Sequence, residues 1–150
     1  MLELSRKSDY ALRAVIYLSR IASGSYGRVS EIAKAKDIPH AFLAQILPLL
    51  ANRGVVKSKQ GAHGGYALAR SPEAISFLDV IESVEGPLRL NKCVEPDHED
   101  CSILDTCEMH HVWNQAQTQM VGFLRGVTMA TMLEAPHHDR QAPIMIQTDS

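Results

Sequence analysis

Three cysteines and a histidine near the middle of the chain restrict its folding more than any other feature. Cys93, Cys101, Cys107 and His110 are spaced C-x7-C-x5-C-x2-H. Because a helix turns by about 100° per residue, these separations do not place the three sulfur atoms on one helical face. Pro96 also opposes a helix between the first two cysteines. The cysteines must therefore converge through a loop.

The last two members of this set are arranged differently. Cys107 and His110 lie three positions apart, so they share a face if a helix begins near Thr106. Soft thiolate sulfur together with one imidazole suits zinc or an iron-sulfur cluster. The alternative is that these are ordinary thiols in an acidic surface loop. An odd number of cysteines without an export signal argues against a disulfide framework and leaves metal ligation or redox chemistry.

The start and the length of the chain limit its class. The first seven residues lack the apolar core of a signal peptide, and the longest uncharged apolar run, residues 41–52, is too short to span a bilayer. We therefore expect a cytoplasmic protein with no membrane partner. A chain of 150 residues, 45% of them hydrophobic, is long enough for one core with an appended element.

The charge of the chain is divided unevenly. Residues 1–70 carry eleven Lys and Arg against four Asp and Glu, a net +7, so the overall net charge of −2 leaves −9 for the remaining eighty residues. This asymmetry predicts that the first half meets a polyanion. A basic face exposed only to solvent is the alternative.

Apolar residues recur at helical spacing three times in the first half of the chain. The pattern predicts helices at residues 8–21, 29–36 and 40–52, with Ser8 and Ser30 as N-caps of the first two. The third helix is expected to bury Phe42, Leu43, Ile46, Leu47 and Leu50. Two helices joined by a tight turn behind a supporting helix form a helix-turn-helix, whose second helix enters the major groove of DNA.

Two prolines affect the third helix. Pro39 is expected at its first position, where a missing backbone N–H removes no hydrogen bond. Pro48 lies inside the helix, at a typical cost of about 3 kcal/mol. We therefore expect a kink that leaves residues 40–47 to read DNA.

A glycine-rich hairpin follows directly. Residues 55–59 and 66–69 are typical of short strands, and residues 60–65 between them contain three glycines. A helix-turn-helix followed by such a hairpin is a winged helix, so the predicted fold class is mainly α with a small β-wing. The basic side chains beside the tip are Lys57, Lys59 and His63. They favour contact with nucleic acid, although the glycines alone would also make a turn.

The second half is expected to supply two more helices. Ser76 caps a helix at residues 77–84, and a long helix runs from about Thr106 to beyond Val127. The apolar stripe of the long helix consists of Trp113, Met120, Phe123, Leu124 and Val127. Because the core of the first domain is already accounted for, this stripe is expected to pack against a second chain. The tail at residues 135–150 is expected to be disordered, and its pair of adjacent histidines to be incidental.

Four segments carry a family resemblance. They are residues 8–13 in the first helix, 42–45 in the recognition segment, 61–66 in the wing, and the ordered cysteines before a long helix. Together they resemble the iron-sulfur winged-helix transcriptional repressors typified by IscR, NsrR and RirA, over roughly residues 1–134. The resemblance implies a homodimer that binds a pseudo-palindromic double-stranded DNA operator and carries one iron-sulfur cluster per subunit. It also implies an operator affinity that responds to iron, redox state, nitric oxide or cluster supply.

The resemblance divides the chain into three parts. Residues 1–86 would form a winged helix-turn-helix DNA-binding domain with a connecting helix, and residues 87–134 the cluster-binding loop and the dimerisation helix. Residues 135–150 would be the tail.

The resemblance leaves the fourth cluster ligand open. Residues 107–110 resemble IscR, where a histidine is the fourth ligand, and so favour His110. Residues 8–10 resemble NsrR, where a carboxylate ligates across the dimer, and so favour Asp9. We prefer His110, because it lies one helical turn from Cys107 and needs no partner chain. The choice between a two-iron and a four-iron cluster stays open, since the first two cysteines are farther apart than in IscR-like members.

The expected DNA contacts follow from the winged-helix interpretation and the resemblance. They are Lys7, Tyr10, Ser30, His40, Phe42, Gln45, Lys57, Lys59, Gln60 and His63. Gln45 and His40 are expected to contact bases from the first turns of the recognition helix, and glutamine pairs with adenine through two hydrogen bonds. Ala44 and Gln60 stand where the IscR-type pattern has a glutamate and an arginine, so the operator is expected to differ from those of IscR-type members.

Two other functions compete with a cluster-dependent regulator that is not an enzyme. A zinc or thiol enzyme would use Cys101 or Cys107 as its nucleophile. No accompanying set of His and Asn or Asp is suggested for it, and the basic helix-turn-helix would have no role. A winged-helix regulator without a cluster would instead be controlled by a protein partner.

Overall fold

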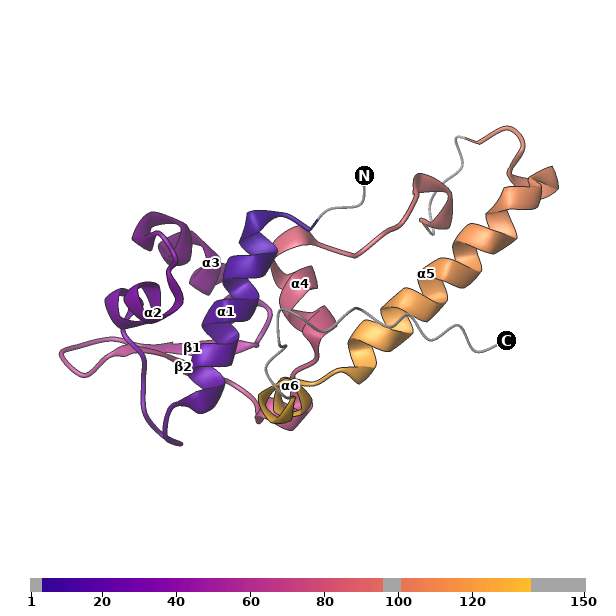
Figure 1. Cartoon of the computed structure of the whole chain (residues 1–150). Helices are drawn as coiled ribbons and strands as arrows, with labels where there is room; N and C mark the ends of the chain where they lie inside the picture. The colour runs from indigo at the N-terminus through magenta and orange to yellow at the C-terminus, as the bar shows by residue number, and fades with distance from the viewer. Residues whose placement is uncertain (1–3, 96–100, 136–150) are drawn as a thin grey trace, which may run out of the picture.

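The computed structural model describes residues 4–95 and 101–135, which are mainly helical with one two-stranded sheet. The helices are α1 (Arg6–Arg20), α2 (Val29–Lys36), α3 (His40–Asn52), α4 (Phe77–Glu85), α5 (Glu108–Gly126) and α6 (Met129–Glu134). The strands are β1 (Val56–Lys59) and β2 (Gly65–Leu68). The short 3-10 turns are η1 (Pro72–Ala74), η2 (Lys92–Val94) and η3 (Leu104–Thr106). Figure 1 shows α5 projecting away from the other helices. The predicted fold class, mainly α with a small wing, is confirmed. The predictions for Pro96 and for the tail beyond residue 135 lie outside the described residues.

The N-cap of α1 is Ser5 and not Ser8. The Ser5 side chain accepts a hydrogen bond from the Lys7 backbone N–H, so α1 begins earlier than predicted. Ser8 is fully buried in the first turn, where its hydroxyl donates to Glu85 Oε1 at 2.7 Å. The serine that periodicity suggested as a cap therefore joins α1 to the end of α4.

The N-cap of α2 also differs from the prediction, although its bounds agree. Arg28 occupies the cap position, and the Glu31 side chain accepts from the Arg28 backbone N–H at 3.0 Å. A carboxylate three residues after the cap satisfies a backbone donor that would otherwise lack a partner. Ser30 is exposed within the first turn, so the prediction of Ser30 as the cap is wrong.

α3 spans the residues that its sequence predicts, but one expected core residue is on the surface. The buried side chains are Leu43, Ile46, Leu47 and Leu50. Phe42 is 46% exposed, because it lies at the edge of the face that these residues define. Pro39 is the N-cap rather than the first helical residue, and α3 continues past the exposed Pro48 to Asn52.

The wing is an antiparallel hairpin attached to the segment before α2. β1 pairs with β2, with Lys59 opposite Gly65 nearest the tip. Gly27 and Tyr66 exchange two backbone hydrogen bonds, each 2.8 Å long. Gly65 has φ 148°, and a Cβ built there would lie 2.4 Å from the Gly27 carbonyl oxygen. Only glycine permits this close approach, so the wing keeps its place beside the start of α2.

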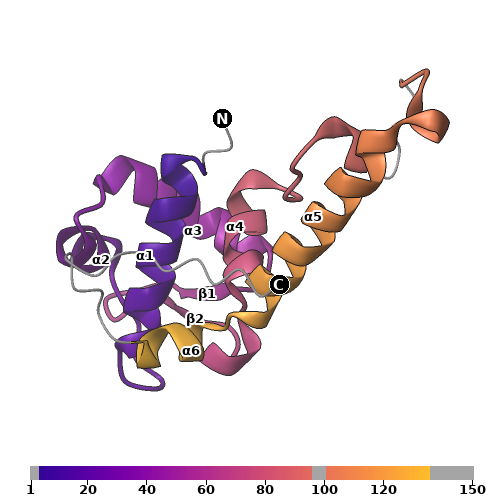
Figure 2. The same cartoon turned by 45° about the vertical axis from the view of Figure 1, so that its right-hand side comes forward.

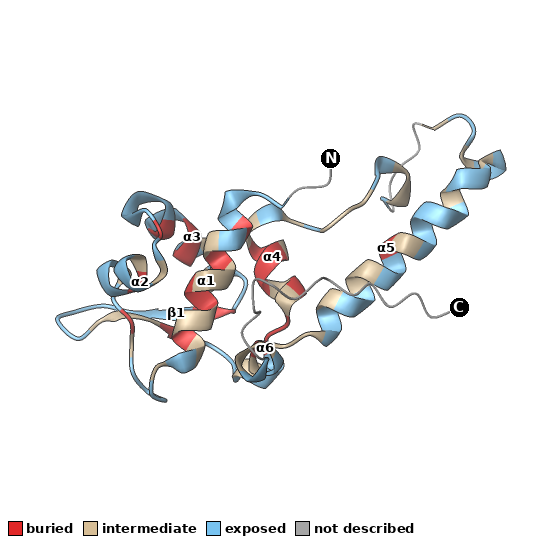
Figure 3. Ribbon diagram, in the orientation of Figure 1, coloured by how far each residue is buried: buried red, intermediate tan, exposed pale blue. Residues whose placement is uncertain are grey.

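The hydrophobic core joins distant parts of the chain. Figure 3 shows its buried residues concentrated in α1, α3 and α4. The same cluster includes Met129 of α6, which is fully buried. Phe77 donates to the Val127 carbonyl at 2.8 Å, and Met129 donates to the Ile75 carbonyl at 2.9 Å, which holds α6 beside the start of α4. The sequence analysis assumed that the first domain completes its own core. The structure shows instead that α6 contributes to this core.

The long helix predicted from Thr106 to beyond Val127 is two helices. Thr106 lies in η3, and α5 begins after it at Glu108. α5 ends at Gly126, because Thr128 is extended and its hydroxyl caps α6. α5 runs from its outer end toward the core, and the chain bends at Thr128 into α6. No helix in the described part of the chain combines the length and the apolar character needed to cross a membrane.

Candidate functional site

One face of α3 is exposed. Because Leu43, Ile46, Leu47 and Leu50 point into the core, the other side of the helix carries the exposed residues His40, Ala41, Ala44, Gln45 and Pro48. His40 and Gln45 are the members of this face with side-chain hydrogen-bonding groups, and both lie in the first turns. The structure thus places both predicted base contacts on the accessible face of the recognition helix.

Phe42 packs against Tyr10 of α1 instead of entering the core. The two ring centroids are 5.9 Å apart with an interplanar angle of 63°, an edge-to-face contact. The Arg13 guanidinium lies 5.7 Å from the centroid of the Tyr10 ring and donates to the Lys36 carbonyl at 3.4 Å. Two of the predicted DNA contacts therefore form one aromatic pair that joins α1 to the start of α3.

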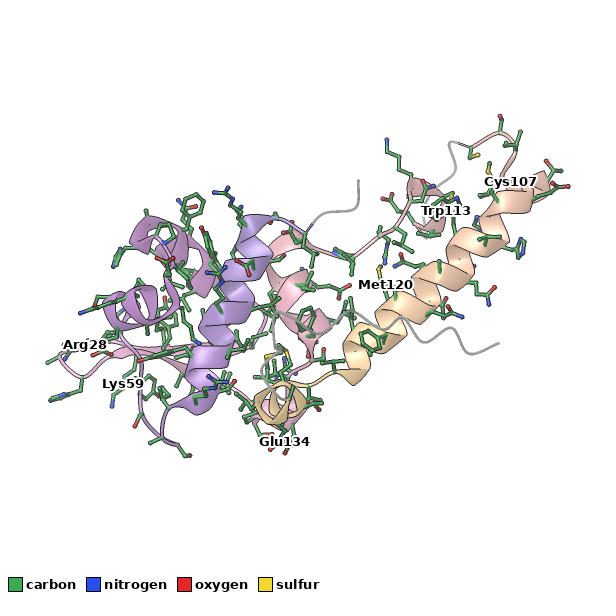
Figure 4. The ribbon with its side chains drawn as sticks, in the orientation of Figure 1. Arg28, Lys59, Cys107, Trp113, Met120 and Glu134 are labelled. Carbon is green, nitrogen blue, oxygen red and sulfur yellow. The ribbon has the colours of Figure 1, made fainter. Side chains whose placement is uncertain are left out.

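The wing carries a group of exposed polar and basic side chains. The predicted contacts among them are Lys57, Lys59, Gln60 and His63. The Lys59 ammonium lies 5.5 Å from the centroid of the Tyr26 ring. Arg28 Nη2 donates to the Ala62 carbonyl in the wing tip at 2.8 Å, and Figure 4 shows Arg28 and Lys59 together at this end of the molecule. Arg28 was not among the predicted DNA contacts, although it lies directly before α2 in the basic half of the chain.

The remaining predicted DNA contacts lie on the same part of the molecule. Lys7 is exposed at the start of α1, and Ser30 is exposed at the start of α2. A polar cleft of about 490 Å³ separates α2 from the wing and is lined in part by Ser25, Arg28 and Lys59. All ten predicted contacts therefore belong to α1, α2, α3 and the wing, and none to the projecting α5.

The end of α4 is attached to the start of α1 through one carboxylate. Glu85 Oε1 accepts hydrogen bonds from the hydroxyls of Ser5 and Ser8. The Ser5 hydrogen bond is the main cause that lowers the pKa of Glu85, and Ser8 and the charge of Lys7 add to it against the opposing effect of burial. The carboxylate is thus held in its charged form.

The predicted metal ligands lie around the outer end of α5. Cys93 is in η2, Cys101 precedes η3, Cys107 is the N-cap of α5 and His110 is in its first turn. All four residues are half-buried, and the three cysteines are free thiols. Figure 4 shows Cys107 at the end of α5 that is farthest from α1.

One ring nitrogen of His110 has no partner among the described residues. Its Nδ1 is buried and forms no hydrogen bond within residues 4–95 and 101–135, whereas Nδ1 of the adjacent His111 lies 2.8 Å from the Glu108 carbonyl. A buried polar atom without a partner is costly, and an imidazole nitrogen is a common donor to iron and zinc. The donor set of three thiols and this nitrogen fits an iron-sulfur cluster.

These donors are not yet gathered at one point. Within residues 4–95 and 101–135, no three His, Cys, Asp or Glu side chains are close enough to hold a metal ion. Asp9 is on α1, where its carboxylate pairs with Arg13 at 2.7 Å. Figures 1 and 2 both show α1 well separated from the outer end of α5. The Asp9 carboxylate of one chain therefore does not meet Cys107 of the same chain.

α5 exposes apolar side chains along most of its length. The exposed fractions are 62% for Met109, 55% for Val112, 37% for Trp113 and 70% for Phe123. Met120 and Leu124 from the predicted stripe are half-buried. Apolar side chains that continue along one projecting helix are typical of an interaction surface.

A helix-turn-helix whose second helix has an exposed face, joined to a basic wing, defines a winged-helix DNA-binding protein. Residues 4–135 match the Rrf2 family model, described as an iron-dependent transcriptional regulator. The chain belongs to the Rrf2 family and is a DNA-binding transcriptional regulator.

Curated relatives agree with this assignment. A protein of Aquifex aeolicus (strain VF5), named as an HTH-type transcriptional regulator, is 34% identical over 83% of this chain and 86% of its own length. The HTH-type transcriptional regulator NsrR of Bacillus licheniformis is 26% identical over 93% of this chain and 98% of its own length.

Two solved structures show how well the fold is shared. CymR, titled the global cysteine regulator of B. subtilis, has a TM-score of 0.72 and 28% identity, over 89% of this chain and 98% of that chain. T. potens IscR has a TM-score of 0.68 and 28% identity, over 89% of this chain and 87% of that chain. Solved structures with different names thus share the architecture of this chain.

Proposed function

We propose that this chain is a homodimeric repressor whose affinity for a double-stranded DNA operator is switched by an iron-sulfur cluster. The observation that carries the proposal is Nδ1 of His110, which is buried and has no hydrogen-bond partner in the part of the chain that the structure describes. It lies one helical turn from Cys107, in a segment with two further free thiols. The description of the family model as iron-dependent and the similarity to NsrR and IscR support it.

DNA binding uses the free face of α3 and the wing. Gln45 and His40 contact base edges in the major groove, since they are exposed in the first turns of α3. Lys59 and His63 approach phosphates from the wing. The basic residues 1–86 thus serve as the DNA-binding domain with its connecting helix, α4.

Dimerisation uses α5. Its exposed apolar residues, Met109, Val112 and Phe123 among them, have no covering element in the described part of the chain. A second copy of the same helix offers a matching apolar surface, and two-fold symmetry is the commonest arrangement for such contacts. Residues 87–134 therefore combine the metal-ligand segment with the dimerisation helix, while α6 returns to the core.

Cys93, Cys101, Cys107 and His110 hold the cluster in this proposal, and Asp9 of a second chain is the competing fourth ligand. The cluster, when bound, supplies a redox-active iron centre that responds to iron, nitric oxide, redox state or cluster supply. Because the four donors are not gathered, binding draws η2 and η3 toward the start of α5. The chain after α4 leads into η2, and α4 packs against α1 and α3, so this movement reaches the recognition helix.

The visible spectrum of anaerobically purified protein tests the proposal most directly. A brown sample with sulfide-to-iron charge-transfer bands, and with iron and sulfide in equal amounts, is expected. Cys107→Ser should lose both the bands and the iron, whereas the exposed Ser102→Ala in the same segment should keep them. Purified protein that is colourless, or that contains only zinc, contradicts the proposal.

A winged-helix regulator without a cluster is the second candidate. The dispersed donors favour it, as does the likeness to CymR, the global cysteine regulator of B. subtilis. Such a regulator would be controlled by a protein partner. It predicts colourless protein that binds its operator specifically and whose affinity changes only when that partner is added.

A further inference from the structure

Gln117 is the buried residue of α5, and both ends of its amide have backbone partners in the segment before Cys93. Its side chain is 8% exposed. Nε2 donates to the Leu88 carbonyl at 2.6 Å, and Oε1 accepts from the Leu90 backbone N–H at 2.9 Å. A backbone carbonyl only accepts and a backbone N–H only donates, so the amide has one allowed orientation.

This pair of bonds resembles the contact between two neighbouring strands. One planar amide offers a donor and an acceptor at the spacing of the Leu88 carbonyl and the Leu90 N–H, and so takes the place of a strand neighbour. Burying the Gln117 amide without partners is costly. Residues 88–90 therefore cannot leave α5 unless the amide is exposed or loses both bonds.

The same short segment is attached to α4 at its other side. Glu82 Oε1 of α4 accepts from the Leu88 backbone N–H at 3.1 Å. Leu88 and Leu90 thus lie between a carboxylate of α4 and an amide of α5. η2, which contains Cys93, begins two residues after Leu90 and packs against α5. The hydrogen bonds of Gln117 therefore reach to within three residues of Cys93.

We propose that Gln117 is a positioning residue that holds the Cys93 segment against α5 before any metal or cluster binds. The inference rests on the proposed cluster function, since it concerns one of the four ligands. α5 carries Cys107 and His110 at its start, so a segment held on α5 keeps Cys93 on the same element as two other donors. Ordering one ligand in advance lowers the entropy that cluster binding must remove. No feature of the sequence separates Gln117 from its neighbours Gln115 and Gln119.

The test compares Gln117→Ala with Gln119→Ala, because Gln119 is exposed on the same helix two residues away. Hydrogen exchange of the Leu90 amide is measured in the metal-free protein. We expect exchange in Gln117→Ala to be faster by about tenfold, because the Leu90 amide loses one buried hydrogen bond. Exchange in Gln119→Ala should be unchanged. Iron release from reconstituted protein to a chelator is then timed, and its visible circular dichroism recorded. Gln117→Ala should release iron several-fold faster and show altered dichroism.

Gln117→Glu preserves the shape of the side chain. It keeps an oxygen that accepts from the Leu90 N–H, and it replaces the nitrogen that donates to the Leu88 carbonyl by a second oxygen. Intermediate exchange and iron release in Gln117→Glu support the positioning role, also if Gln117→Ala fails to fold. The proposal is overturned if the protein loads iron and the Gln117 variants match Gln119→Ala in both exchange and iron release. If the proposed function itself is wrong, the result is different, because neither the unmodified protein nor any variant would then take up iron.

Discussion

The Ser8 hydroxyl, fully buried in α1, donates a hydrogen bond to Glu85 Oε1 at the end of α4 at 2.7 Å. α1 also carries Tyr10, which packs against Phe42 at the start of the recognition helix. α4 leads into the segment that Gln117 holds on α5. The bond between Ser8 and Glu85 therefore lies between the proposed metal-ligand segment and the DNA-reading helix.

The stability that Glu85 contributes should depend on pH. Its hydrogen bonds with Ser5 and Ser8 lower the pKa of Glu85 in the folded protein. A carboxyl with a lowered folded-state pKa stabilises fully above its unfolded-state pKa and loses this effect as pH falls toward the folded-state value. Urea unfolding of metal-free Glu85→Gln should therefore show lower stability than the unmodified protein at pH 7. The two should converge as the pH is lowered through the carboxyl range. Glu73→Gln, at an exposed carboxyl in η1, is the control, and a difference that is constant with pH would contradict the linkage.

Gln45 should contribute sequence specificity. Replacing Gln45 by Ala is expected to cost about 1 to 3 kcal/mol of binding free energy on the operator and little on random DNA, because it removes a base contact. Fluorescence anisotropy with both DNA fragments measures the difference. An equal loss on the two fragments would rule out Gln45 as a base contact.

Lys59 should behave in the opposite way. Lys59→Ala is expected to weaken binding to all sequences alike and to make the log-log slope of affinity against salt shallower by about 1. With four phosphate contacts per dimer the slope of the unmodified protein would be about −3.6. A sequence-dependent loss in Lys59→Ala would show that the wing reads bases.

Arg28 should act on the wing as well as on DNA. Its guanidinium donates to the Ala62 carbonyl at 2.8 Å, so Arg28→Ala removes both a positive charge and a tether of the wing tip. We expect weaker binding to all sequences and faster amide exchange at residues 61–64. Arg20 is an exposed arginine at the end of α1, so Arg20→Ala is the charge control and should not change exchange in the wing. Unchanged exchange in Arg28→Ala would reduce its role to a surface charge.

The two candidate fourth ligands can be distinguished by replacing each of them with alanine. His110→Ala should lose iron and change the visible spectrum, because His110 Nδ1 is buried and has no hydrogen-bond partner among the described residues. Asp9→Ala should keep both, since its carboxylate pairs with Arg13 and lies away from the cysteines of its own chain. Reconstitution of both variants side by side, with iron analysis, decides between them. Full iron in His110→Ala together with loss in Asp9→Ala would identify the carboxylate of a second chain as the ligand.

Cluster loading should change operator affinity. We expect holo and metal-free protein to differ by a coupling free energy of about 1 to 3 kcal/mol, because the ligand segment joins α4 to α5 and α4 packs on α1 and α3. Operator titrations of both forms at one salt concentration measure it. Identical affinities and footprints would exclude the switch.

Local patterns in the sequence were sufficient for much of the fold. The helical periodicity of residues 29–36 and 40–52 and the glycines between two short strands are effects of near neighbours, so the bounds of α2, α3 and the wing were predicted well. The same local chemistry identified Gln45 and His40 as exposed on α3. It also marked Cys93, Cys101, Cys107 and His110 as a metal-ligand set, whose cluster remains a proposal.

Contacts between residues far apart in the chain were decided by the tertiary structure alone. Serine is a preferred N-cap residue, so Ser8 was predicted as a cap. The partner that determines its role, Glu85, is 77 positions away. Met129 follows the segment that was predicted as one long helix, yet it belongs to the separate helix α6 and is fully buried in the common core. Gln117 differs from Gln115 and Gln119 only because residues 88–90 fold against one face of α5. Periodicity assigns a side chain to a face, whereas the partner that this face meets depends on the packing of the whole chain.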